Sequence, residues 1–175
     1  DRGSEVVTIK GERRSSLIIE PANGKVPLTP ERRQYLAERM RTMRQNFDGP
    51  EARPLGERCL LAFGSGSGPP MLPVLYNNHY QIVQTQDAVM ILVEMVHDAR
   101  IIRLNGEPAP DAIPRWMGDS VGRWEGDTLV VETQNFTEHE GFRGGTPDAK
   151  IIERFRRVAP DKIEYRFTVE DPRAF

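Results

Sequence analysis

The fold is decided by residues 80–104, which read YQIVQTQDAVMILVEMVHDARIIRL. Apolar residues dominate two short runs, 80–85 and 88–96, and the two residues between them suit a tight turn. This pattern predicts a β-hairpin. If the second strand continued unbroken to the end of the stretch, it would measure roughly 55 Å at about 3.3 Å per residue, far beyond the usual length. The sequence therefore predicts a bend, bulge or turn near His97 and Asp98.

The second of these strands is apolar on both faces. One face carries Val89, Ile91, Val93 and Met95, and the other carries Met90, Leu92 and Val96. We therefore expect both faces to be buried, one against the interior of the sheet and the other beneath a helix. Glu94 lies in the middle of this strand.

Further hairpins are expected downstream. Gly126 marks the turn of one and Pro160 that of the next. In the last run, apolar side chains alternate strictly with charged or polar ones. About seven short strands in about ninety residues favour a mainly β fold, an antiparallel meander that closes into a barrel or a strongly curled sheet. The runs predicted to form these hairpins are 120–124, 128–133, 151–158 and 162–169.

Residues 1–70 are predicted to form an N-terminal arm. A short strand is expected at 15–21, and a helix from Thr29 to about Gln45, because threonine caps helices and proline suits the first helical position. A loop rich in glycine, serine and proline then leads into a barrel core at 71–175, within a single domain overall. The helix stripe expected to cover the 88–96 strand consists of Tyr35, Leu36, Met40 and Met43.

The composition is that of an ordinary soluble protein. Of 175 residues, 38% are hydrophobic and 29% charged, and the formal net charge is -2. This near balance favours neither nucleic acid nor an anionic membrane as a partner, and no apolar run is long enough for membrane insertion. Cys59 is the only cysteine, so no internal disulfide can form. A monomer or homodimer is expected.

Polar residues on the apolar strand are the first candidates for catalysis. A carboxylate such as Glu94 on a doubly buried strand must be paired or protonated, and burial of this kind produces general acids and bases. A structural salt bridge to an arginine explains Glu94 equally well. His97 could titrate near neutral pH, with Asp98 beside it, although a hydrogen-bonded histidine at a strand end is the simpler interpretation. Arg100 could stabilise negative charge.

The string Gly118-Asp119-Ser120-Val121-Gly122 fits the G-x-S-x-G pattern of serine hydrolases. A nucleophile elbow needs a strand before the serine and a helix after it, whereas here a strand follows. Asp119 and Ser120 are therefore expected to satisfy backbone groups in a turn. His79, His97 and His139 lack the spacing of a zinc site, so no metal or cofactor is predicted.

A ligand pocket is predicted from aromatic, amide and arginine side chains near strand ends. Aromatic residues with a polar atom often line such pockets, and arginine can bind an anionic group. The candidate ligand-binding residues are Asn77, Asn78, Tyr80, Arg115, Trp116, Asp119, Ser120 and Trp124. For each of them, ordinary turn chemistry is the alternative.

Four strings carry a resemblance to a known family: LGERC at 55–59, YNNHYQIVQ at 76–84, HDARII at 97–102 and GDSVGRWEGDTLVV at 118–131. They resemble a large family of uncharacterised bacterial proteins that are mostly predicted to be exported. The resemblance implies a periplasmic or extracellular location and transfers no mechanism. The strand pattern is also similar to calycin-like (lipocalin-like) barrels, an analogy of architecture only, whose members usually bind small apolar ligands.

Three functional hypotheses follow. The first is a barrel that binds a small, partly apolar molecule. The second is a metal-free acid–base enzyme in the same pocket, which uses Glu94 or His97 with Arg100 or Arg115 for elimination, isomerisation or hydrolysis. The third is an accessory domain that contacts other proteins through an exposed strand edge. A pocket shared by Glu94 and His97 would separate the second from the first.

Overall fold

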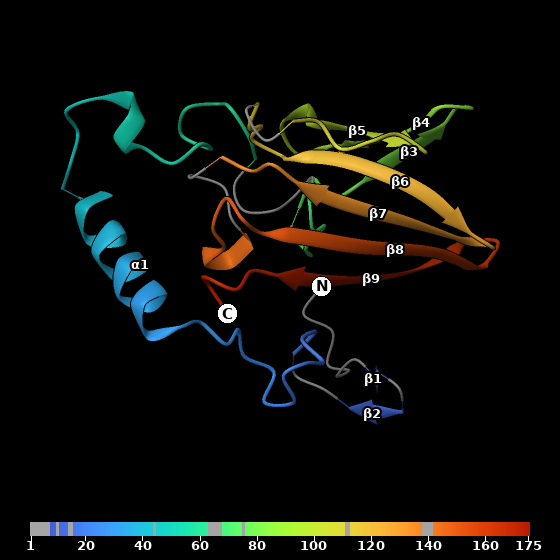
Figure 1. Cartoon of the computed structure of the whole chain (residues 1–175), viewed down its shortest axis with the longest axis horizontal. Helices are drawn as coiled ribbons and strands as arrows, with labels where there is room; N and C mark the ends of the chain where they lie inside the picture. Colours follow the sequence, from blue (N-terminus) through green and yellow to red (C-terminus); the bar gives the residue numbers. More distant parts are fainter. Residues whose placement is uncertain are drawn as a thin grey trace.

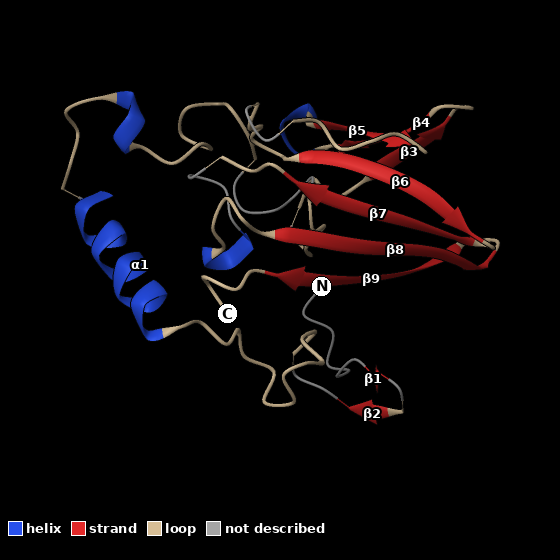
Figure 2. Cartoon of the chain, viewed as in Figure 1, coloured by secondary structure: helices blue, strands red, loops and turns tan. Residues whose placement is uncertain are grey.

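Alternating apolar and polar side chains build a seven-stranded sheet in the computed structural model (Figure 1). The structure describes residues 8–9, 11–13, 16–43, 45–62, 68–74, 76–110, 113–137 and 142–175. The strands of the sheet are β3 (Tyr80–Gln84), β4 (Ala88–Val93), β5 (Ala99–Leu104), β6 (Asp119–Glu125), β7 (Thr128–Gln134), β8 (Lys150–Ala159) and β9 (Lys162–Glu170). The other elements are a hairpin of β1 (Thr8–Ile9) and β2 (Glu12–Arg13), helix α1 (Pro30–Met43), and three 3-10 turns, η1 (Pro50–Ala52), η2 (Met95–His97) and η3 (Phe142–Gly144) (Figure 2).

The predicted mainly β fold is confirmed. The sheet runs in the order β3-β4-β5-β6-β7-β8-β9 and curls strongly into a half-barrel. Side chains from β4, β5, β7 and β8 fill its concave face, because alternate residues of a strand point to the same side. On β9, Tyr165 packs against this core as expected. The buried residues of this core cluster are Val89, Ile91, Ile102, Leu129, Val131 and Phe155.

One strand pair departs from the predicted antiparallel meander. Strands β5 and β6 are parallel, with Ile102 opposite Ser120 and Leu104 opposite Gly122, whereas every other pair in the sheet is antiparallel. Two adjacent parallel strands need a crossover of about a dozen residues or more. Residues 105–118 supply that crossover, and their irregular pattern does not indicate the direction in which the chain returns.

The predicted break after the second strand is confirmed. Strand β4 ends at Val93, the turn η2 follows, and β5 begins at Ala99. Val96 and His97 have φ angles of 48° and 60°, in the left-handed region that non-glycine residues rarely adopt. The turn reverses the chain, so that Leu92 and Ala99 become cross-strand neighbours.

Helix α1 forms as predicted, but it does not cover β4. It lies beside η3 and the C-terminal end of the chain (Figure 1). Arg32 donates hydrogen bonds of 2.6 Å to the carbonyls of Gly144 and Gly145, and Leu36 packs on Gly144, where a Cβ would lie 2.5 Å from its Cδ1. These contacts hold the helix beside η3 and the C-terminal end of the chain, away from β4, so the outer face of β4 is only half-buried.

The predicted strand at 15–21 is wrong. Residues 16–20 form irregular chain with bends at Leu17 and Glu20, and the Ser16 hydroxyl donates to the Gly24 carbonyl at 2.9 Å. The same hydroxyl accepts the backbone N–H of Ile18 at 3.1 Å, a donor that strand pairing could have used, and Leu17 stays exposed. Much of the predicted 64–70 linker lies outside the described residues.

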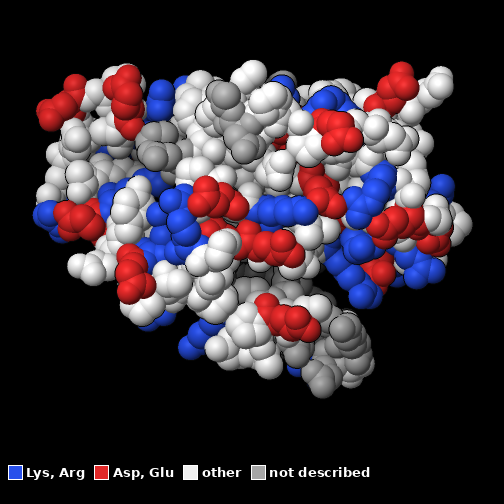
Figure 3. Space-filling model, viewed as in Figure 1, with Lys and Arg blue, Asp and Glu red and all other residues white. Residues whose placement is uncertain are grey.

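Ion-paired side chains cover the outer face of β6, β7 and β8. Val130 is fully buried there, with Arg123 and Arg154 as its cross-strand neighbours. The guanidinium of Arg123 binds Glu132 at 2.7 Å, and that of Arg154 binds Glu125 at 2.9 Å. Charged residues of both signs intermingle over this side of the molecule (Figure 3). The opposite, concave face of the same strands is therefore where an apolar site can form.

Candidate functional site

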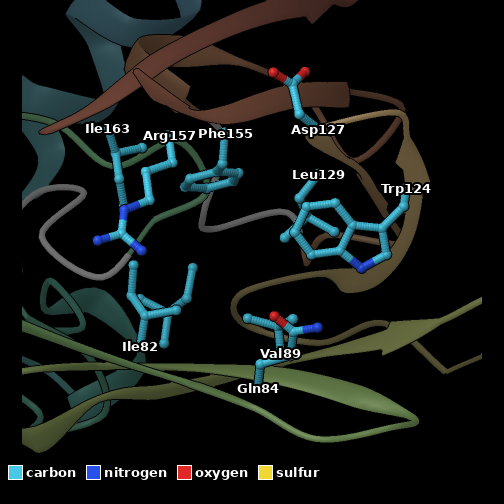
Figure 4. A pocket seen from close by; sticks show the side chains of 10 residues that line it. Ile82, Gln84, Val89, Trp124, Asp127, Leu129, Phe155, Arg157 and Ile163 are labelled. Carbon is cyan, nitrogen blue, oxygen red and sulfur yellow. The ribbon is translucent and has the colours of Figure 1, made fainter. Parts of the chain in front are cut away.

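The concave face of the half-barrel is hollow near its β3–β4, β6–β7 and β8–β9 turns. The cavity measures about 130 Å³, and every strand of the sheet except β5 contributes to its wall (Figure 4). Most of the wall is aliphatic or aromatic. The lining residues are Ile82, Gln84, Val89, Ile91, Trp124, Asp127, Leu129, Phe155, Arg157 and Ile163.

Strand alternation places these side chains, and the curl of the sheet leaves the cavity open. Val89 and Ile91 lie two residues apart on β4 and share its inner face, where they form the closed floor, 2% and 1% exposed. Ile82, Trp124 and Ile163 are 44%, 46% and 50% exposed. Ile82 and Ile163 belong to the two edge strands of the sheet, so these three residues form an apolar mouth.

Two charged residues stand at this mouth. The carboxylate of Asp127 accepts a hydrogen bond of 3.2 Å from Nε of Arg156, and this bond holds the pKa of Asp127 below its usual value. Arg157 donates from Nε to the carbonyl of Ala159 at 3.3 Å and from Nη2 to that of Pro160. The positive charge of Arg157 therefore has no carboxylate partner in the part of the chain that the structure describes.

A buried polar cluster lies in the interior, formed by Arg100, Glu153 and Tyr165. The guanidinium of Arg100 meets the carboxylate of Glu153 in two bonds of 2.6 and 3.1 Å, and both side chains are almost fully buried. The Tyr165 hydroxyl donates to Glu153 at 2.7 Å and accepts from the backbone N–H of Met71 at 2.9 Å. Two charged side chains can be buried together in this way because the paired hydrogen bonds offset part of the cost of removing both charges from water.

We expect the protein to lose stability above about pH 10, the usual pKa of tyrosine, because of Tyr165. Burial, followed by the neighbouring charge of Glu153 and the bond to it, raises the pKa of the Tyr165 hydroxyl. Above this pH the unfolded chain releases the proton that the folded chain retains, so each pH unit lowers the free energy of unfolding by about 1.4 kcal/mol. Urea denaturation between about pH 9 and 11 measures this slope. Tyr165→Phe should show a smaller slope; parallel slopes would refute the assignment.

Glu94 is not buried, contrary to prediction. Strand β4 ends one residue before it, and its side chain is 47% exposed. Its carboxylate meets Nδ1 of His79 at 2.8 Å, and this hydrogen bond lowers the pKa of Glu94. The prediction failed because it extended the strand through residue 96. The alternative, a salt bridge to an arginine, is also wrong in its partner, because Glu94 is paired with His79.

The other predicted catalytic residues do not form one site. His97 is exposed on η2. Asp98 accepts the backbone N–H of Ala62 at 3.0 Å and so ties the N-terminal arm to the sheet. Arg100 points inward and pairs with Glu153. Neither these three residues nor Glu94 lines the apolar cavity.

The Gly118-to-Gly122 string has structural roles. Gly118 adopts a φ of 69°, and a Cβ there would lie 2.8 Å from the Gln134 carbonyl oxygen. The Ser120 and Thr133 hydroxyls are hydrogen-bonded to each other at 2.9 Å in the interior. Ser120 lies within β6 and the strand continues to Glu125, so Ser120 does not form a nucleophile elbow, as expected from the sequence.

Asp119 anchors the crossover between β5 and β6. Its buried carboxylate accepts bonds from Nη2 of Arg103 at 2.6 Å, from the backbone N–H of Ala109 at 2.7 Å and from Nη1 of Arg115 at 3.1 Å. The predicted role in satisfying a backbone group is confirmed for Asp119, although it lies in β6 rather than in a turn, and is wrong for Ser120, which bonds the Thr133 side chain. The two arginines, which the sequence did not assign to Asp119, neutralise its charge.

The remaining predicted ligand-binding residues are scattered. Asn77 and Asn78 are exposed, and the Asn78 amide donates to the Val74 carbonyl at 3.3 Å. Tyr80 is packed against two parts of the core, and burial raises the pKa of its hydroxyl. Trp116 is half-buried away from the cavity wall. Trp124 is the predicted ligand-binding residue that lines the cavity.

Sequence reasoning missed Glu153 and Arg157. Glu153 occupies the inward position between Ile151 and Phe155 on β8, so a carboxylate among alternating apolar residues was the available signal. Arg157 continues the same inward series towards the mouth. Its role could not be inferred without knowing where the sheet opens.

Neither the search for metal sites and membrane spans nor the comparison with known proteins assigns a function to this chain. Among the described residues, no group of three or more His, Cys, Asp or Glu side chains could hold a metal ion, and no described helix has the length and apolarity of a membrane span. His139 lies outside the described residues. Comparison of the chain with family models, curated proteins and solved structures finds no match.

Proposed function

We propose that this protein binds a small, partly apolar molecule in the cavity of the half-barrel, in the exported setting that its family resemblance implies. The observation that carries the proposal is the cavity wall. Apolar side chains from almost every strand converge on one hollow, which opens to solvent between the two edge strands. Concave, largely apolar sites with a few polar groups are typical of small-molecule binding.

The cavity size limits the ligand. A volume of about 130 Å³ compares with engineered apolar cavities of about 150 Å³ that take up benzene. One ring or a short run of methylene groups fits inside, and a longer molecule would project through the mouth. Burying about five methylene groups contributes about 4 kcal/mol, which corresponds to a dissociation constant near 1 mM. Small probes should therefore be tested at millimolar concentration.

Binding without chemistry is the hypothesis with the better support. The acid–base enzyme required Glu94 and His97 in a common pocket with Arg100 or Arg115, and none of them lines this cavity. Asp127, the carboxylate that does line it, is paired with Arg156 and has a lowered pKa, which makes it a weak base. The interaction-domain hypothesis rests only on the edge positions of β3 and β9 in the sheet, which any half-barrel would have.

Filling the mouth should prevent binding. We expect Ile82→Trp to weaken the binding of 1-hexanol at least about tenfold, because the added ring occupies the space between the edge strands. Ile82 is already 44% exposed, so the larger side chain is tolerated. Hexanol binding by the parent is measured by titration followed by the fluorescence of Trp124, in a Trp116→Phe background that leaves Trp124 as the only native tryptophan.

The matched control is Val83→Trp. Val83 is the next residue on β3, is 38% exposed and points to the outer face. The same enlargement there should leave hexanol binding within about twofold of the parent. In both tryptophan variants, nuclear magnetic resonance shifts of the hexanol replace the fluorescence signal. Equal loss in both variants, or no binding by the parent, would refute the cavity as the binding site.

A further inference from the structure

The mouth of the cavity presents an arginine with unused hydrogen-bond donors. Arg157 lies on β8 beside Phe155, and its guanidinium points towards Ile82 and Ile163 (Figure 4). Its bonds to the Ala159 and Pro160 carbonyls use Nε and one N–H of Nη2. Both N–H groups of Nη1 and the second of Nη2 have no bond among the described residues.

The charges around this mouth do not cancel. Asp127 is engaged by Arg156 on the neighbouring strand, so that pair is neutral. Gln84 contributes an uncharged amide. Asp127 and Arg157 are the two charged residues of the described lining, and because Asp127 pairs with Arg156 outside the lining, Arg157 is the one without a carboxylate partner among the described residues.

We propose that the ligand is an amphiphilic anion, an apolar chain or ring that carries one carboxylate, with the apolar part in the cavity and the carboxylate on Arg157. This inference rests on the proposed function and identifies its ligand class. A planar carboxylate matches the fork of a guanidinium and can take two of its free donors. Because the head group stays at the mouth in contact with water, its charge is not desolvated at the cost that a buried carboxylate carries.

We expect the cavity to prefer an acid over the matching alcohol by a moderate factor. An ion pair at a half-exposed site is screened by water and salt. We therefore expect hexanoate to bind about three- to tenfold more tightly than 1-hexanol, and benzoate to exceed benzyl alcohol by a similar factor. Comparing the hexyl compounds with the benzyl compounds distinguishes a fatty-acid-type ligand from an aromatic acid, because the cavity shape should favour either the aliphatic chain or the ring.

The test compares the four probes on three proteins at low salt, by fluorescence of Trp124 in the Trp116→Phe background. Arg157→Gln removes the charge at the mouth and keeps a shorter, polar side chain that can still donate hydrogen bonds. Arg166→Gln removes one charge from the outer face of β9, where Arg166 pairs with Glu164. The acid-to-alcohol affinity ratio should fall to about one in Arg157→Gln and stay near its parent value in Arg166→Gln. Added salt should lower the parent ratio.

The outcomes separate the two proposals. If the alcohols bind the parent and the acids bind no more tightly, or if Arg157→Gln leaves the ratio unchanged, the anionic ligand is refuted and the apolar cavity stands. If both variants lower the ratio equally, the preference reflects net charge, and Arg157 is not the carboxylate site. If neither alcohols nor acids bind the parent, the proposed function fails together with this inference.

Discussion

Replacing Glu153 by alanine should lower the free energy of unfolding by about 3–5 kcal/mol, because it leaves the charge of Arg100 buried without a partner. Both side chains are almost completely buried, and Arg100 offers two bonds of 2.6 and 3.1 Å to this carboxylate. The same change removes the acceptor of Tyr165. The Nε of Arg100 already lacks a partner among the described residues, so the guanidinium has little other compensation. Urea denaturation followed by circular dichroism measures the loss.

Glu132→Ala is the control for this loss. Glu132 lies on the outer face of β7, is 33% exposed and bridges Lys150 and Arg123. Its removal should lower the free energy of unfolding by less than about 1 kcal/mol, because exposed ion pairs contribute little. If the Glu153→Ala chain does not fold, Glu153→Gln, which keeps an acceptor for Tyr165, gives an intermediate loss that can be measured. A loss at Glu153 no larger than that at Glu132 would contradict the assignment.

A triple variant tests whether the Arg100–Glu153–Tyr165 cluster makes the fold more stable than apolar side chains would, or whether the fold is destabilised only when one member of the cluster is missing. Replacing all three members, as Arg100→Met, Glu153→Leu and Tyr165→Phe, leaves neither charge unpaired. Buried ion pairs replaced in this way by apolar side chains are often neutral or even stabilising. We therefore expect the triple variant to be more stable than Glu153→Ala alone.

Strand positions were predictable where periodicity alone determines them. The hairpin around Gly126 and the alternation of Ile163, Tyr165 and Phe167 follow from turn chemistry and the two-residue period, and both are present. The break at His97 followed from chain length. The parallel pairing of β5 and β6 did not follow, because it depends on the path of residues 105–118, which have no period of their own.

The candidate site was less predictable, for a reason that Glu94 and Glu153 illustrate together. The principle that a carboxylate among apolar strand residues must be paired was sound, but it was applied to Glu94, which lies one residue past the end of β4. Glu153 satisfies the same principle inside β8 and has its partner in Arg100. Strand ends shift by one or two residues between sequence and structure, and one residue reverses the face. A site residue near a predicted strand end therefore cannot be assigned to a face.

Asp119→Ala should lower the free energy of unfolding by about 2–4 kcal/mol, because Asp119 holds the crossover between the parallel strands β5 and β6. Its carboxylate is 1% exposed and accepts three hydrogen bonds, one of them from the backbone of the crossover. The backbone N–H of Ala109 would lose its acceptor, which costs about 1–3 kcal/mol if it stays buried. Arg103 and Arg115 are about half-exposed, so water can solvate them again, and the loss stays below that at Glu153.

Asp119→Asn tests whether the bond to the Ala109 backbone N–H stabilises the crossover. This crossover carries the chain between the two parallel strands β5 and β6. An asparagine retains one oxygen for the Ala109 N–H, but it removes the charge and replaces the oxygen that accepts from Arg115 with an NH2 group. Urea denaturation should show that Asp119→Asn loses about half the free energy of unfolding that Asp119→Ala loses, if the backbone bond contributes as much as the two arginines. Equal losses in the two variants would mean that the ion pairs alone hold the crossover. Hydrogen exchange at the Ala109 amide gives a local readout, because it should accelerate in Asp119→Ala and remain protected in Asp119→Asn.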